Sequence, residues 1–344
     1  MSGISPMTGR LEVPLSILAA VSKRQHAFVE ALGNPSLSTD AGKVVLNTRT
    51  KRSSAMKTNM TYSSRNHDAL FMPMNFSNHF LMLQYRVQLV RCEPTSHFNV
   101  LGTYCTGNGI LHDDSQRFHL DAWTDAEWNG FRNNFTSIIT RYWDEKFELT
   151  PNRPWYPNPS PQPPSASAIT CNLSLELVDS AAQAHHRYFI VKPQESNFRS
   201  FASSPNRLGM FTHRDLAYDW NTRRTQVGPA DRRGRRKMHS VSFLQCTVLH
   251  EFGHTLGLDH VNGAGNDDWN YGVSLDQRED LMGMGDHLTG REAFPWKSQL
   301  RHHLIPEPAD HKPHVPALKF TARVTAPQLI TYWDNDWTPA PATP

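Results

Sequence analysis

Cysteine is scarce in this sequence of 344 residues, and its charge is close to balanced. The four cysteines are Cys92, Cys105, Cys171 and Cys246, and no two of them form a CxxC pair. This set is too small and scattered for a disulfide-dense scaffold or a zinc ribbon, although one bridge, between Cys92 and Cys105, is compatible with it. The 35 basic and 32 acidic residues leave a formal charge of +3. We therefore do not expect a dedicated nucleic-acid-binding protein, which usually carries a strong basic excess.

Long apolar runs are also missing. No stretch reaches the roughly 18 apolar residues that a membrane helix needs, so no membrane span is expected. The first ten residues, MSGISPMTGR, lack the layout of a secretory signal, and the apolar patch Leu15–Val21 ends at Ser22, Lys23 and Arg24. We expect a soluble protein that is cytoplasmic or exported by a route without a cleaved signal. Its length and 38% hydrophobic content allow a sizeable core.

Composition divides the chain into three parts. Residues 1–75 have a short helical pattern (Ile17–Leu32) and then a polar run, which predicts an N-terminal arm or leader. Residues 76–304 are expected to form the main folded domain. Residues 305–344 are expected to be a C-terminal extension with a disordered tail.

Periodicity predicts several elements inside the main domain. The run FLMLQYRVQLVRC that follows His79 is typical of a strand, and Ile169–Val178 and His186–Val191 are predicted to be strands that pair with it. Thr124 is expected to begin a helix, with Asp125 and Glu127 in its first turn. The apolar residues of this helix recur at spacings of three and four: Trp128, Phe131, Phe135, Ile138, Ile139 and Tyr142.

Two segments have an unusual composition. Seven prolines between Pro151 and Pro164 favour a long extended surface loop over an interdomain linker or docking peptide. The segment DRRGRRK, Asp231–Lys237, is the densest basic cluster. A solvent-exposed loop or hairpin tip is its simplest interpretation, and contact with an acidic substrate or a processing site is the alternative.

The strongest chemical signal lies in VSFLQCTVLHEFGHTLGLDH. This run is predicted to be a helix up to Leu256, with Ser240 or Ser242 as its N-cap. His250 and His254 then lie about one turn apart, so both imidazoles project from one face and can bind one zinc ion. Glu251 lies about 100 degrees around the helix from His250, where it can reach a metal-bound water without being a ligand.

The residues after this helix predict a third ligand. Gly257 is placed to end the helix in a left-handed conformation, which glycine adopts without a Cβ clash. The resulting turn would bring His260 back towards His250 and His254. Three histidine ligands would leave the fourth zinc position open, as in a catalytic site.

The stretch HEFGHTLGLDH, His250–His260, resembles the HExxHxxGxxH zinc-binding sequence of the metzincin metallopeptidases at every fixed position. Metzincins also have a methionine turn below the metal. In the sequence EDLMGMG we assign that role to Met282, preceded by Leu281, rather than to Met284. The specific motifs cover Ser240 to about Trp296.

The resemblance implies an α+β fold of the zincin kind. It comprises a twisted mixed β-sheet, mostly parallel, an active-site helix beneath it, a horizontal substrate cleft and a C-terminal helical subdomain. Thr289 and Glu292 fit a capping box, and Pro295 fits the first turn of a final helix that ends at Leu304. The tyrosine that some metzincins place two residues after the turn methionine is replaced here by Met284, and no cysteine-switch motif is present.

A second resemblance concerns the third ligand. The segment GNDDWNYG, Gly265–Gly272, is similar to the GTxDxxYG sequence of the aspzincin peptidases, with Asn266 in place of threonine. In that interpretation Asp268 replaces His260. An ordinary turn is the simpler interpretation of this segment.

Together these patterns predict a zinc-dependent endopeptidase that hydrolyses peptide bonds in protein or peptide substrates. His250, His254 and His260 would hold the zinc, and Glu251 would be the general base. The alternative is a delivered toxin or effector, or a zinc-stabilised interaction module, in which binding dominates. Nucleic-acid binding through Arg232–Lys237 would need aromatic or groove-entering elements that the sequence does not show.

Overall fold

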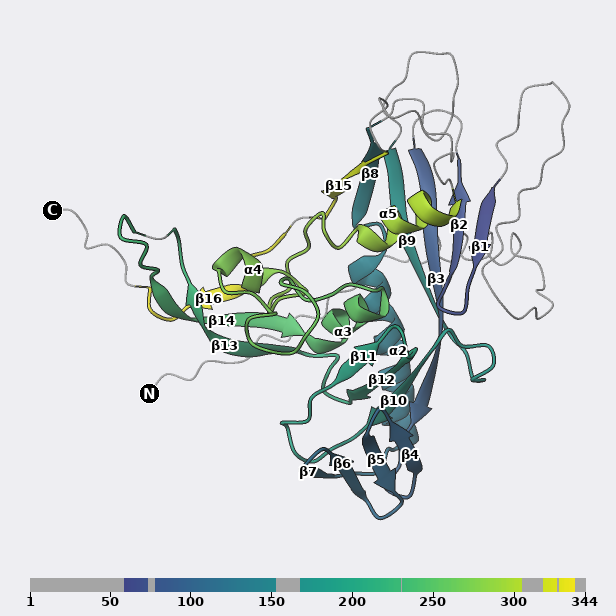
Figure 1. Ribbon diagram of the computed structural model, residues 1–344. Helices are drawn as coiled ribbons and strands as arrows, with labels where there is room; N and C mark the ends of the chain where they lie inside the picture. The colour runs from purple at the N-terminus through teal and green to yellow at the C-terminus, as the bar shows by residue number, and fades with distance from the viewer. Residues whose placement is uncertain are drawn as a thin grey trace, which may run out of the picture. The chain divides into compact units, whose positions relative to one another are not determined.

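The computed structural model describes residues 59–73, 78–152, 168–229, 231–304, 318–326 and 328–337. The expected helix Ile17–Leu32, most of the proline-rich segment and the end of the C-terminal tail lie outside these residues. The described part is a mixed α+β structure that consists mostly of strands (Figure 1). None of its helices is long and apolar enough to cross a membrane.

A nine-stranded sheet forms the centre of the fold. Its main path runs in the order β11 (Phe201–Ser203), β12 (Leu208–Thr212), β10 (His186–Val191), β3 (Asn78–Arg91), β9 (Ala168–Leu177), β8 (Phe147–Pro151) and β15 (Phe320–Val324). The hairpin of β1 (Met60–Ser63) and β2 (Asp68–Met72) joins through β2, which pairs with β3. The strands predicted after His79, at Ile169–Val178 and at His186–Val191 are confirmed, as is their pairing with β3.

The sheet is mixed, and the expectation of a mostly parallel sheet is wrong. Only the central pairs β12–β10, β10–β3 and β3–β9 are parallel. The outer pairs, β1–β2, β2–β3, β11–β12, β8–β9 and β8–β15, are antiparallel. The connections β1–β2, β2–β3 and β11–β12 are too short for the crossover that a parallel pair requires.

The expected domain boundaries also need correction. Strands β1 and β2 lie within residues 1–75, and β15 lies within residues 305–344, yet all three belong to the central sheet. The boundary at residue 76 would separate β2 from its antiparallel neighbour β3, with Phe71 opposite Leu81. These strands have four or five residues each, too few for a clear alternating pattern within a polar region.

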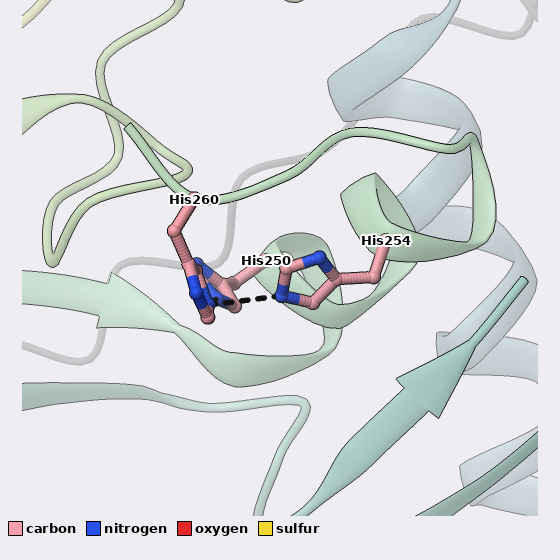
Figure 2. A group of neighbouring side chains, drawn as sticks. All are labelled: His250, His254 and His260. Atoms are coloured by element: carbon pink, nitrogen blue, oxygen red, sulfur yellow. Dashed lines mark hydrogen bonds between the residues drawn. The ribbon is translucent and has the colours of Figure 1, made fainter. Parts of the chain in front are cut away.

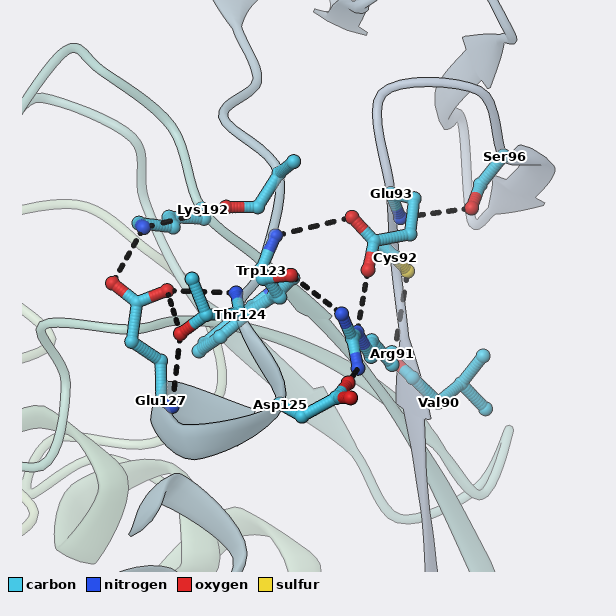
Figure 3. A network of polar contacts seen from close by, with 11 residues as sticks. Val90, Arg91, Cys92, Glu93, Ser96, Trp123, Thr124, Asp125, Glu127 and Lys192 are labelled. Carbon is cyan, nitrogen blue, oxygen red and sulfur yellow. Dashed lines mark hydrogen bonds and ion pairs between the residues drawn. The ribbon is translucent and has the colours of Figure 1, made fainter. Parts of the chain in front are cut away.

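Helix α2 (Asp125–Trp143) packs on one face of the sheet and begins as predicted at Thr124. The Thr124 hydroxyl accepts from the Glu127 N–H, and the Glu127 carboxylate accepts from the Thr124 N–H in return, which completes a capping box. Lys192 bonds Glu127, and Arg91 bonds Asp125, so the start of α2 is tied to the ends of β10 and β3 (Figure 3).

The opposite face of the sheet is covered at one end by a small antiparallel sheet. Its strands are β4 (His97–Val100), β5 (Thr103–Thr106), β6 (Ile110–Asp113) and β7 (Gln116–His119). Cys92 and Cys105 share the apolar cluster beneath this sheet, but both are free thiols, as are Cys171 and Cys246. The suggested Cys92–Cys105 bridge is therefore not formed.

A third sheet precedes the histidine motif. It contains β13 (Tyr218–Gln226), β14 (Met238–Cys246) and β16 (Tyr332–Asp334). The basic segment 231–237 lies in the exposed loop between β13 and β14, as its simplest interpretation predicted. Ser240 and Ser242 lie in β14, so the prediction that either caps the helix is wrong. The run 240–246 alternates buried Val241 and Phe243 with outward residues, but it continues without a break into the helix.

The last part of the main domain contains only short helices. These are α4 (Leu275–Glu279), α5 (Phe294–Gln299) and a π-helical turn η1 (Leu300–Leu304). Pro295 lies in the first turn of α5 as expected, whereas the bonded pair Thr289 and Glu292 precedes α5 instead of capping it. Trp296 is fully buried and donates from its indole N–H to the Asn172 carbonyl in β9, which fixes α5 against the central sheet.

Candidate metal centre

The histidine motif is carried by α3 (Thr247–Thr255), which continues directly from β14 (Figure 1). Val248, Leu249 and Phe252 are buried in the main core and hold one side of this helix in place. The Val248 N–H donates to the Asp215 carbonyl at 3.1 Å, so a fixed loop satisfies a backbone donor in the first turn.

The predicted glycine follows the end of the helix and its C-cap residue, Leu256. Gly257 has φ +90°, and its N–H bonds the His254 carbonyl while the Leu258 N–H bonds the Gly253 carbonyl. These two bonds form a Schellman motif, in which a left-handed residue reverses the chain after the last turn. The reversal returns His260 to the helix.

The three histidines meet at their Nε2 atoms (Figure 2). The His260 Nε2 lies 3.0 Å from the His254 Nε2 and 3.2 Å from the His250 Nε2. A tetrahedral zinc with bonds of about 2.0–2.1 Å separates its nitrogen ligands by about 3.3 Å. Both separations therefore fit one small ion, and all three nitrogens lie within 4.8 Å of one another.

Each imidazole is oriented through its other nitrogen. The Nδ1 atoms of His250, His254 and His260 lie 2.7, 2.7 and 2.6 Å from the carbonyl oxygens of Leu281, Leu258 and Gly265. A carbonyl only accepts, so each Nδ1 carries the proton and each neutral ring presents an Nε2 lone pair to the others. Burial lowers the pKa of all three rings, that of His260 to about 4, which favours this ligand form. Three facing lone pairs repel one another unless a cation lies between them.

The rival third ligand lies in a different environment. Both oxygens of Asp268 bond the Arg278 guanidinium, at 2.6 and 3.2 Å, and the Asp268 side chain is 62% exposed. Arg278 is buried, so this carboxylate balances its charge. The structure brings His260, and not Asp268, to His250 and His254.

Met282, which the sequence assigns to the methionine turn, packs against Gly253 of α3. It is fully buried, and a Cβ placed on Gly253 would lie 2.4 Å from its sulfur atom. The preceding Leu281 carbonyl binds His250. Met284 instead packs with Val241 and Phe243.

Glu251 faces a cavity next to the histidines. Its Oε2 accepts from the Ala202 N–H of β11 at 2.9 Å, and burial raises its pKa to about 8. The cavity has a volume of about 800 Å³ and is also lined by His254, His260, β11 and residues Leu101–Thr103 at the β4–β5 turn of the small sheet. Space for a sizeable ligand therefore adjoins both the histidines and the carboxylate.

Two further residues at this cavity were not found from the sequence. The ring centroid of Tyr271 lies 4.0 Å from that of His260, and the Tyr271 hydroxyl accepts from the Arg199 guanidinium. Tyr271 belongs to GNDDWNYG, where the sequence drew attention to Asp268 instead. Arg199 lies in no motif, and only the fold brings it to the site.

Comparison of this chain with protein-family models, curated proteins and solved structures finds no match.

Proposed function

We propose that this protein is a zinc-dependent endopeptidase of the metzincin type, with His250, His254 and His260 as the metal ligands and Glu251 as the general base. The convergence of the three Nε2 atoms beside a cavity that contains Glu251 carries this proposal. Three protein ligands leave a fourth position open, which is typical of catalytic rather than structural zinc.

The chemistry of the donor set supports zinc. All three ligands are neutral imidazoles held by carbonyl acceptors, an arrangement that orients the ring and increases its basicity. Zinc bound there would supply Lewis acidity to a peptide carbonyl and to water.

Glu251 is placed to move the proton. Its Oε2 is anchored by the Ala202 N–H, and its carboxylate borders the cavity. Burial increases the proton affinity of this carboxyl group, and in its ionised form it can accept a proton from the attacking water. It can then donate that proton to the amine nitrogen as the C–N bond breaks.

Strand β11 supports a peptide as the substrate. It is the last strand on its side of the described sheet, and its middle residue, Ala202, contacts Glu251. An extended peptide can pair with such an edge, which would lay its backbone along the cavity. A zinc-stabilised interaction module would account for the three ligands but would give Glu251 no role.

The metzincin assignment is supported by local features. These are the left-handed Gly257, the return of His260, and Met282 packed below Gly253. They reproduce the order and spacing of the metzincin motifs, although the sheet is parallel only at its centre.

Metal analysis and peptide hydrolysis together test the proposal. We expect about one zinc per purified chain, and hydrolysis of a mixed peptide library that stops when a chelator removes the metal and returns when zinc is added. A chain without zinc affinity, or hydrolysis that is unaffected by metal removal, would contradict it.

A further inference from the structure

We propose that Arg199, held in place by Tyr271, forms an anion-binding subsite beside the three histidines, and that the preferred substrates are peptides with a carboxylate close to the scissile bond. The part of this inference that concerns turnover rests on the proposed function. The subsite itself consists only of protein side chains.

Arg199 lies in the same cavity as the candidate catalytic groups. It precedes β11 by two residues, its side chain is exposed, and it lines the cavity together with Glu251, His254 and His260. An anion bound to Arg199 would therefore lie next to the reacting groups.

Among the described residues, no carboxylate forms an ion pair with this arginine. Its hydrogen-bond partner is the neutral phenol of Tyr271. Four acidic residues line the cavity, namely Asp113, Asp114, Glu251 and Asp259. The charge of Arg199 acts on Glu251 across the cavity, but none of the four forms an ion pair with Arg199. By contrast, Arg278 is paired with Asp268. Arg199 thus has no ion-pair partner among the described residues and presents its guanidinium to the cavity, where it can bind an anionic group.

The guanidinium is held in a defined position. A guanidinium only donates, so the Tyr271 hydroxyl oxygen accepts the hydrogen bond from Arg199. The Cζ atom of Arg199 lies 5.8 Å from the centroid of the Tyr271 ring. Tyr271 in turn packs against His260. The next residue, Ser200, donates to the buried Asp215 carboxylate at 2.5 Å, which anchors the backbone on the other side.

The remaining N–H groups fit a carboxylate. A guanidinium has five donors in a planar fork that matches the two oxygens of a carboxylate, and one N–H to Tyr271 leaves the others available. In a peptide, such a group is an aspartate or glutamate side chain or the C-terminal carboxylate. Both sources share this chemistry, so the experiment must separate them.

The first test compares turnover of matched peptides by the zinc-loaded protein. One series replaces Glu by Gln at each position around the cleaved bond, and a second replaces the C-terminal acid by an amide. We expect kcat/KM to be about 10- to 100-fold higher for the carboxylate at one position, which identifies the source. Arg199→Met should abolish this preference, and Arg199→Glu should shift it towards a Lys-containing peptide. Arg232→Met, which removes an exposed charge from the β13–β14 loop, should leave it unchanged.

The second test measures binding of the same peptides to the metal-free protein by calorimetry. We expect the carboxylate peptide to bind more tightly than its neutral partner, and Arg199→Met to remove the difference. The subsite would be contradicted if the Arg199→Met variant still preferred the carboxylate peptide, or if the wild-type protein bound and cleaved both peptides equally. Neither result would contradict the proposed peptidase function. Arg199-dependent binding without any zinc-dependent hydrolysis would instead support the subsite and contradict the proposed function.

Discussion

The Nε2 of His260 lies 3.0 Å from the Nε2 of His254, although the two residues belong to different segments. His254 is in the last turn of α3, and His260 follows the left-handed reversal at Gly257. With both Nδ1 atoms bonded to carbonyls, the two lone pairs face each other. This unfavourable approach is relieved when a cation binds, which makes the third ligand the clearest point to test.

His260→Ala should weaken zinc binding by at least about 100-fold, because it removes one of three ligands. Asp268→Asn should leave zinc affinity unchanged but lower the free energy of unfolding by about 1–2 kcal/mol, since buried Arg278 loses a mostly exposed partner. Titration with a zinc indicator and urea unfolding measure the two effects. If Asp268→Asn lost zinc and His260→Ala did not, Asp268 would be the third ligand in place of His260.

Gly253→Ala should destabilise the protein by about 1–3 kcal/mol, although alanine is the better helix former. The added Cβ would lie 2.4 Å from the Met282 sulfur. Gly130→Ala in α2 is the matched control, since nothing lies within 4 Å of its Cβ position, and it should stabilise by about 0.5–1 kcal/mol.

Urea unfolding with a double variant separates crowding from other effects. If Met282 is the obstacle, Gly253→Ala combined with Met282→Ala should cost less than the sum of the two single changes. Additive costs would show that Met282 does not pack below the helix.

The Asp286 carboxylate should make stability depend on pH. Burial raises its pKa from 3.8 to about 6, even though the Tyr218 hydroxyl donates to it. A raised pKa in the folded state means that this contribution to stability is present below the unfolded value and is lost as the pH rises through about 6. The free energy of unfolding of the wild type, relative to Asp286→Asn, should fall by about 2 kcal/mol between about pH 4 and pH 7. If the difference in free energy of unfolding between the wild type and Asp286→Asn did not vary with pH, the raised pKa of Asp286 would be contradicted.

The residues that could be predicted from the sequence are those whose role depends on local spacing. His250 and His254 share a helix face because they lie four residues apart, and Gly257 reverses the chain because glycine adopts a left-handed conformation without a Cβ clash. The capping box of Thr124 and Glu127 likewise needs only residues three apart. Strand β3 and its two parallel neighbours could be recognised from long apolar runs.

The features that were missed depend on long-range contacts. The run from Ser240 or Ser242 to Cys246 is predicted to be helix from its apolar residues, whereas its pairing with β13 and β16 makes it a strand. Arg199 reaches Tyr271 from 72 residues away, and β15 pairs with β8 across an even longer separation. No local pattern encodes these pairings. The position of Arg199 beside the histidines and the outer strands of the sheet could therefore be found only in the folded structure.

Glu251→Gln tests the central claim most directly, because it keeps the shape of the side chain and its acceptor for the Ala202 N–H but removes the base. Zinc content and peptide hydrolysis should be measured on the same preparation. The proposed function predicts that the variant keeps about one zinc per chain and that kcat falls by about 10²–10⁴-fold. Hydrolysis at the wild-type rate, with zinc retained, would contradict the assignment of Glu251 as the base.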